Sequence, residues 1–242
     1  MRKGISQEGL KLLACLTMLC DHIGYALIIH MPEQAVLYYM LRIIGRLAFP
    51  IYAFLLVEGF YHTRNALRYF LRLLTGVLLA ELPYDLMASG GFSWGSQSVM
   101  VTLLLGFLAL AVMDKCRNFY WKPMVALPFL LLAELALCDY GWQGVALVVL
   151  FAMSREYYAR NIIRFGGMLV IFHTMPSIAL TFGTIAIPMQ ALGALSILFF
   201  ANYDGRKLTT SRAAQWGFYL FYPVHMLILS VAEWLIYGGY SL

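Results

Sequence analysis

The sequence predicts an all-α membrane protein, a polytopic bundle of about nine transmembrane helices. Of the 242 residues, 62% are apolar and only 12% are charged, whereas a soluble domain has roughly 45–50% apolar and roughly 25% charged residues. The mean hydropathy of +0.76 agrees. A core of this size cannot hide so many apolar side chains, because a folded sphere still needs polar surface. Lipid is therefore the expected solvent, which excludes a soluble enzyme, a disordered chain and a secreted disulfide scaffold.

The length sets the number of helices. A spanning helix takes about 20 residues, so nine helices use roughly 180 and leave about 60 for ends and loops. No room remains for an extramembrane domain, and we expect one transmembrane domain, acyltransferase-like on the resemblance given below, over residues 1–242. The apolar segments are 9–30, 36–61, 66–86, 97–113, 120–138, 142–154, 162–177, 184–201 and 214–237.

The cations then orient these segments in the membrane. If the N-terminus is cytoplasmic and each segment crosses once, nearly all cations fall on the inner side, while the outer loops 90–97 and 139–141 receive none. This is the positive-inside pattern. It predicts a multi-pass protein of the bacterial cytoplasmic membrane, with the N-terminus inside and the C-terminus outside. It also explains the net charge of +5 without nucleic acid. The inner cations are Arg2, Lys3, Lys11, Arg64, Arg68, Arg72, Lys115, Arg117, Lys122, Arg155, Arg160, Arg164, Arg206, Lys207 and Arg212.

The first segment carries Asp21 and His22 near its middle. Charged groups at this depth cost several kcal/mol and mark functional sites by default. Lys11 lies eleven residues before His22, so both fall on one helix stripe about 16 Å apart along the axis. A long donor from the cytoplasm would bind its anionic end at Lys11 and present its reactive end to His22. Asp21 points about 100° away from His22. The alternative is a buried pair satisfied by backbone carbonyls.

The second segment places Arg42 and Arg46 on one helix face, since they are four residues apart. Pro50 follows and leaves the carbonyl of Arg46 without its helical donor, which predicts a kink. The arginines would bind an anionic group of the substrate or pair with a catalytic carboxylate. The alternative is a structural ion pair with Glu81 or Asp85.

A cationic ridge starts the third segment. Arg64, Arg68 and Arg72 are spaced by four, and guanidinium groups bind phosphates well. The alternative is ordinary positive-inside anchoring. Glu58 and His62 just before the ridge are the only pair at metal-ligand spacing, which is too weak to predict a metal site.

Further polar groups interrupt the outer halves of the segments. Glu81 and Asp85 flank Pro83 and would form an acidic vestibule for a cationic or amine acceptor. His225 follows Pro223 in the last segment, where the proline opens a kink. These three groups, together with Glu58, are candidates for substrate binding. The alternatives are interface carboxylates and a structural histidine.

These residues resemble the TraX family. The resemblance rests on 10–24 with its Asp-His-Ile-Gly, on 41–51, on 54–65, on Glu-Leu-Pro-Tyr-Asp at 81–85 and on Phe-Tyr-Pro-Val-His at 221–225. It covers nearly the whole chain. The family is named for a conjugative-pilus protein that N-acetylates pilin subunits. The chain is also distantly similar to the acyltransferase-3 group, in which a cation, ten residues and a catalytic His lie on the first helix. Lys11 and His22 match that spacing, and Arg68 and Arg72 look like that group's acyl-CoA arginines.

The resemblance implies a transmembrane acetyltransferase that uses acetyl-CoA. Lys11, Arg64, Arg68 and Arg72 would bind the nucleotide head. His22 would deprotonate the acceptor or carry the acetyl group, with Asp21 orienting it. The acceptor would be an amine or hydroxyl of a peptide or protein N-terminus, a glycan or a small amine. We expect membrane lipid as surroundings, no nucleic acid and no metal.

Two other function classes compete with this interpretation. Intramembrane Asp, His, Arg and Glu beside prolines are also typical of a proton-coupled small-molecule transporter. A non-catalytic assembly subunit is the third class, and it predicts no continuous cavity between Lys11 and His22.

Overall fold

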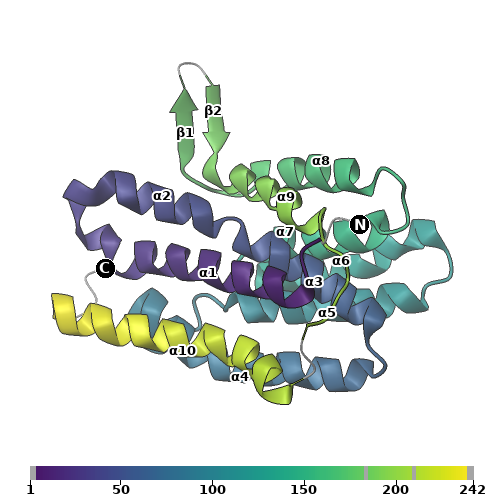
Figure 1. Cartoon of the computed structure of the whole chain (residues 1–242), viewed down its shortest axis with the longest axis horizontal. Coiled ribbons are helices and arrows are strands. Elements are labelled where there is room, and N and C mark those ends of the chain that lie inside the picture. Colours follow the sequence, from purple (N-terminus) through teal and green to yellow (C-terminus); the bar gives the residue numbers. More distant parts are fainter. Residues whose placement is uncertain (1–3, 183–184, 209–210, 239–242) are drawn as a thin grey trace.

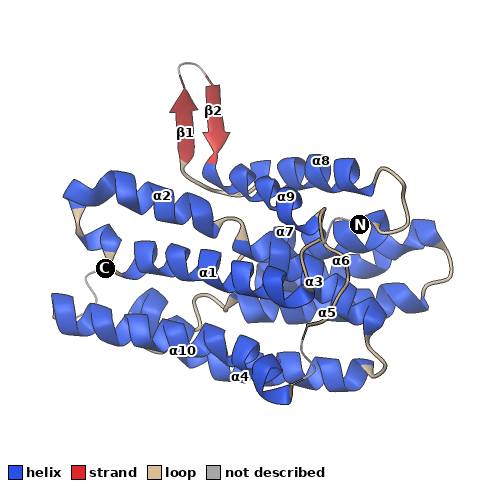
Figure 2. Cartoon of the chain, in the orientation of Figure 1, coloured by secondary structure: helices blue, strands red, loops and turns tan. Residues whose placement is uncertain are grey.

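The structure, a computed structural model, is described for residues 4–182, 185–208 and 211–238. It is a bundle of helices that run roughly along one axis (Figure 1), with almost no strand (Figure 2). This confirms the all-α fold class. The helices are α1 (Gln7–Ala26), α2 (Ala35–Gly45), α3 (Ala48–His62), α4 (Ala66–Ser89), α5 (Val99–Lys115), α6 (Lys122–Leu135), α7 (Gly141–Ser154), α8 (Arg160–His173), α9 (Ile197–Phe200) and α10 (Arg212–Tyr237).

Three helical stretches of the described chain are long and apolar enough to cross a membrane. They are Gln7–His30, Pro32–His62 and Ala213–Tyr237, and Gly141–Ser154 and Met189–Phe200 are shorter apolar helices. Large apolar side chains face outward, as with Val36 at 72%, Leu78 at 72% and Ile228 at 61% exposed. Such a surface suits lipid and not water. The number of nine spans and the sides of the termini stay predictions.

The segment predicted at 36–61 is not one helix, because it breaks into α2 and α3 at Arg46 and Leu47. Pro50 is the third residue of α3, a position where a missing N–H costs nothing. The proline therefore starts a second helix where the sequence predicted a kink in one. The amide of Leu47 bonds to the carbonyl of Ile44 in a tighter turn, which lets the chain change direction.

The segment predicted as a helix at 184–201 is a larger departure. Its first residue lies outside the described part of the chain. From 185 it forms strand β2 (Ile185–Pro188), the 3₁₀ stretch Met189–Ser196 and the short α9. β2 pairs antiparallel with β1 (Ala179–Phe182), and the hairpin stands out from the bundle (Figure 1). β-branched residues before a proline favour strand over helix. The seventh segment, predicted over 162–177, correspondingly ends as a helix at His173.

Helix α1 holds the central position for function. It packs against α2, α3 and α10, and α10 packs on α4 (Figure 1). Beneath it, α3 is buried along nearly its whole length, and Phe54 stacks on Phe200 with ring centroids 4.8 Å apart. Ser6 caps α1 by accepting a hydrogen bond from the amide of Gly9 (3.1 Å), and Asn65 caps α4 in the same way through Arg68 (2.8 Å).

Candidate active site

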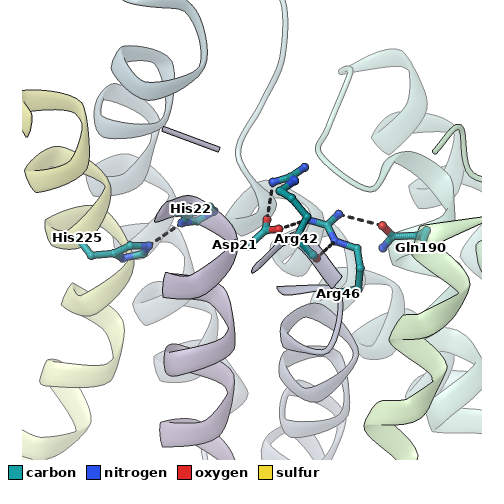
Figure 3. A network of polar contacts seen from close by, with 6 residues as sticks. All are labelled: Asp21, His22, Arg42, Arg46, Gln190 and His225. Carbon is teal, nitrogen blue, oxygen red and sulfur yellow. Dashed lines mark hydrogen bonds and ion pairs between the residues drawn. The ribbon is translucent and has the colours of Figure 1, made fainter. Parts of the chain in front are cut away.

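The site begins with a carboxylate held by two guanidinium groups (Figure 3). Asp21 of α1 pairs with Arg42 of α2 at 2.9 Å and with Arg46, at the end of α2, at 2.5 Å. Each arginine takes a different carboxylate oxygen. The predicted pairing of Arg42 and Arg46 on one helix face therefore serves a carboxylate on the neighbouring helix. Glu81 and Asp85, the alternative partners, lie elsewhere.

Arg46 is fixed at two further points (Figure 3). Its Nε donates to the carbonyl of Arg42 (3.1 Å), and its Nη1 donates to Oε1 of Gln190 (2.9 Å). Gln190 comes from the 3₁₀ stretch after the hairpin and is itself buried. The sequence signal for this contact was the polar side chain of Gln190 within an otherwise apolar segment, and the sequence analysis did not use it.

Gly45 explains how α1 and α2 come so close. A Cβ at this position would lie 2.5 Å from Cγ of Asp21 and closer still to its Cβ. Only a glycine therefore lets the two helices approach until both guanidinium groups reach the carboxylate.

A pair of histidines lies beside this ion cluster (Figure 3). Nδ1 of His22 on α1 is 2.6 Å from Nε2 of His225 on α10. Nδ1 of His225 is in turn 2.6 Å from the carbonyl oxygen of Phe221. His225 is 6% exposed, whereas His22 is half-buried. The structure thus joins two candidate residues that are 203 positions apart, and it turns Asp21 toward the arginines and not toward His22.

Two cavities meet next to His22. The smaller one, about 190 Å³, is lined by His22 and Asp21 together with Arg42, Arg46 and Asp139. The larger one, about 600 Å³, reaches Lys11. Four residues line both cavities, so the cavities adjoin at these side chains, here called the neck: Met18, Tyr52, Val99 and Tyr222. The two cavities therefore follow one another along α1, from Lys11 past Met18 to His22.

Cations outnumber carboxylates in the lining of the larger cavity, where the carboxylates are Glu8 and Glu58. Lys11, Arg64, Arg72 and Lys207 line it, and they come from three separate parts of the chain. Arg68 lies outside this cavity but lines a neighbouring one of about 370 Å³ with Arg72 and aromatic residues of α10. The ridge at the start of α4 thus faces two hollows. Arg2 and Lys3 lie outside the described residues, as does the side chain of Arg212.

The remaining candidates lie at the edges of this route. Glu58 lines the larger cavity and pairs with Arg155 (3.3 Å), with His62 at 3.7 Å. Glu81 accepts a 2.6 Å hydrogen bond from the hydroxyl of Ser98. Asp85 is buried, and its Oδ2 accepts from the amide of Ser93 at 3.2 Å.

Glu81 and Asp85 therefore hold the connection between α4 and α5. In the described part of the chain they are not among the residues that line the two cavities, although Tyr84 between them is. The acidic group that does line the smaller cavity is Asp139, in the connection between α6 and α7. Enclosure by the protein raises its pKa to about 6, against the opposing effect of Arg46.

Within the described residues no three His, Cys, Asp or Glu side chains are grouped to hold a metal ion.

Apolar helices around an ion cluster, a histidine pair and two adjoining cavities define a helical membrane protein with a polar site inside its bundle. The chain belongs to the TraX family, because the family's sequence profile, described as TraX protein, matches residues 6–233. This confirms the resemblance to the TraX family, and the distant similarity to the acyltransferase-3 group stays a prediction. The similar proteins include the "Probable fimbrial assembly protein FimC, serogroup H1" of Dichelobacter nodosus, which is 29% identical over 242 residues, 93% of this chain and 94% of that protein. No solved structure matches the chain.

Proposed function

We propose that the protein is a membrane-embedded acetyltransferase that moves an acetyl group from cytoplasmic acetyl-CoA to an amine or hydroxyl acceptor. The similar D. nodosus protein is named as a probable fimbrial assembly protein, and this name supports a subunit of a surface fibre as the acceptor. We take the cationic end of the larger cavity as cytoplasmic, following the positive-inside pattern.

One observation carries this proposal: the cationic cavity and the His22 cavity share a neck. A donor with an anionic head and a long arm would bind its phosphates at Lys11, Arg64 and Arg72, since guanidinium groups favour phosphate. Its arm would pass Met18 and Tyr52 toward His22. A non-catalytic assembly subunit has no need for such a route.

The chemistry follows from the groups around the smaller cavity. The acceptor nitrogen or oxygen bonds to the acetyl carbon, the carbon–sulfur bond breaks, and CoA leaves as its thiolate. His22 takes the proton of the acceptor and returns it to that sulfur, so no net proton is consumed. The guanidinium groups of Arg42 and Arg46, which share Asp21 and line the cavity with His22, would stabilise the oxyanion of the transition state. Asp21 then acts by positioning both arginines.

The test is the transfer activity of the purified, detergent-solubilised protein. The substrates are ¹⁴C-acetyl-CoA and a short peptide with a free N-terminal amine, and release of free thiol is followed in parallel with hydroxylamine as a small nucleophile. His22→Gln should lower both signals by roughly 100-fold or more, the usual size of a general-base contribution.

His173→Gln is the matched control, because His173 is exposed at the end of α8 and lines neither cavity. It should behave like the wild type. Wild-type protein that releases no thiol would overturn the proposal, and solute flux across liposomes without acyl transfer would favour a transporter instead.

A further inference from the structure

We propose that His225 is a positioning residue that fixes the tautomer of His22, so that Nε2 of His22 is the atom that takes the acceptor proton. This inference rests on the proposed acetyl transfer and assigns a role to each nitrogen of the histidine pair. The chain of contacts runs from the carbonyl of Phe221 to His225, and from His225 to His22 (Figure 3).

The direction of the hydrogen bonds follows from one end of this chain. The carbonyl oxygen of Phe221 can only accept, so Nδ1 of His225 carries a hydrogen and donates to it over 2.6 Å. In a neutral ring Nε2 is then the acceptor. It accepts from Nδ1 of His22 over 2.6 Å. Nδ1 of His22 therefore holds the hydrogen of that ring, and Nε2 keeps its lone pair.

The surroundings favour this neutral arrangement. A second proton on the pair would put a charge in the bundle, which is costly without a counter-ion. Asp21, the next residue in the chain, already gives both its oxygens to Arg42 and Arg46. Within the described residues no hydrogen bond reaches Nε2 of His22, and His22 lines the smaller cavity. Its basic nitrogen is thus open to a substrate.

The two rings are held edge to edge. Their planes differ by 11° and their centroids are 4.9 Å apart, a separation close to one hydrogen bond plus two ring radii. Phe221 stacks on His225 at 4.7 Å, and the ring of Tyr222 stands across it at 5.9 Å. Because His225 is packed on these sides, it cannot rotate without breaking its bond to the carbonyl.

Proton movement in the reaction then has a definite course. When Nε2 of His22 takes the proton, the ring becomes an imidazolium, and its Nδ1–H bond to His225 becomes charge-assisted and stronger. His225 gains no proton and stays an acceptor. The same Nε2–H afterwards protonates the CoA thiolate, which restores the starting tautomer.

Two variants of His225 separate positioning from packing. His225→Gln brings an amide oxygen to the place of Nε2, so it can still accept from His22. His225→Asn has an amide nitrogen near the place of Nδ1, so it keeps the bond to Phe221 but does not reach His22. If His225 acts through the tautomer, the Gln variant should retain kcat to within about tenfold, while the Asn variant should lose roughly 100-fold or more. The KM for acetyl-CoA should be unchanged in both.

The tautomer itself is read by nitrogen NMR of protein labelled with ¹⁵N-histidine, with the His22 signals assigned by their loss in His22→Gln. We expect an unprotonated Nε2 in the wild type and in His225→Gln, and a mixture of tautomers in His225→Asn. A protonated Nε2 in the wild type, or a Gln variant as inactive as the Asn variant at equal thermal stability, would overturn the inference. Wild-type protein without thiol release would instead defeat the proposed function, and the NMR result would still decide the tautomer.

Discussion

Replacing Gly45 by alanine tests the close approach of α1 and α2 on which the ion cluster depends. The new Cβ would lie 2.5 Å from Cγ of Asp21 and closer to its Cβ. Since Cβ is fixed to the backbone, rotation of the Asp21 side chain gives no relief. Carbon atoms need about 3.5–4.0 Å, so the two helices must separate by about 1 Å or more.

That separation reaches the ion pairs. The contacts of Asp21 with Arg46 and Arg42 are now 2.5 Å and 2.9 Å long. A further separation of about 1 Å would lengthen both beyond about 3.2 Å, the usual limit of such a hydrogen bond. Overpacking costs about 1–3 kcal/mol, and weaker contacts of Asp21 with both arginines add to this cost. We therefore expect Gly45→Ala to lower the free energy of unfolding by at least about 1–3 kcal/mol and to reduce transfer activity.

Reversible unfolding in mixed detergent micelles measures this change, and Gly166→Ala is the matched control. Gly166 is inside α8, and a Cβ there meets no atom within 4 Å. In a helix this exchange should stabilise by up to about 1 kcal/mol. Equal stability of the two alanine variants would refute the close approach of α1 and α2, and with it the geometry of the Asp21 cluster.

Two further predictions concern the larger cavity and its neck. Arg72→Gln should raise the KM for acetyl-CoA about tenfold or more with little change in kcat, because Arg72 lines the cationic end and is far from the bond that breaks. Arg117→Gln, a change of the same charge outside that cavity, is its control, and equal KM values would remove Arg72 from the donor site. Met18→Trp should fill the neck, so that binding of acetyl-CoA measured by calorimetry persists while transfer is lost. Met124→Trp, on the exposed face of α6, should leave both intact, and full transfer by the Met18 variant would show that the donor takes another route.

Hydrophobicity predicted the fold class because each long apolar run has one solution in lipid, a helix that satisfies its own backbone. It failed where an apolar run contained a short local signal for a different structure. Pro50 starts a new helix after a tight turn, and the β-branched residues before Pro188 form a strand. Both signals are short, and an average over about 20 residues hides them.

The candidate site could likewise be predicted only in part. The helical period alone placed Lys11 and His22 along one stripe, and the cavities follow that stripe past Met18. The partners of these residues come from helices that are distant in sequence. Asp21 meets Arg42 and Arg46 across α1 and α2, and His225 reaches His22 from α10. No periodicity within one helix contains that information, so sequence reasoning identified the groups and not their pairs.

The pairing itself gives a reason why Asp21 and His22 are adjacent without contacting each other. Were the carboxylate bonded to His22, it would hold the imidazolium in place and oppose return of the proton to sulfur. Because two guanidinium groups take the carboxylate, the base is oriented by a neutral ring, and the nearby charge is positive. A positive surrounding disfavours a lasting imidazolium and favours an oxyanion. On the proposed mechanism, the same arrangement therefore weakens one charged intermediate and stabilises the other, which favours return of the proton within each cycle.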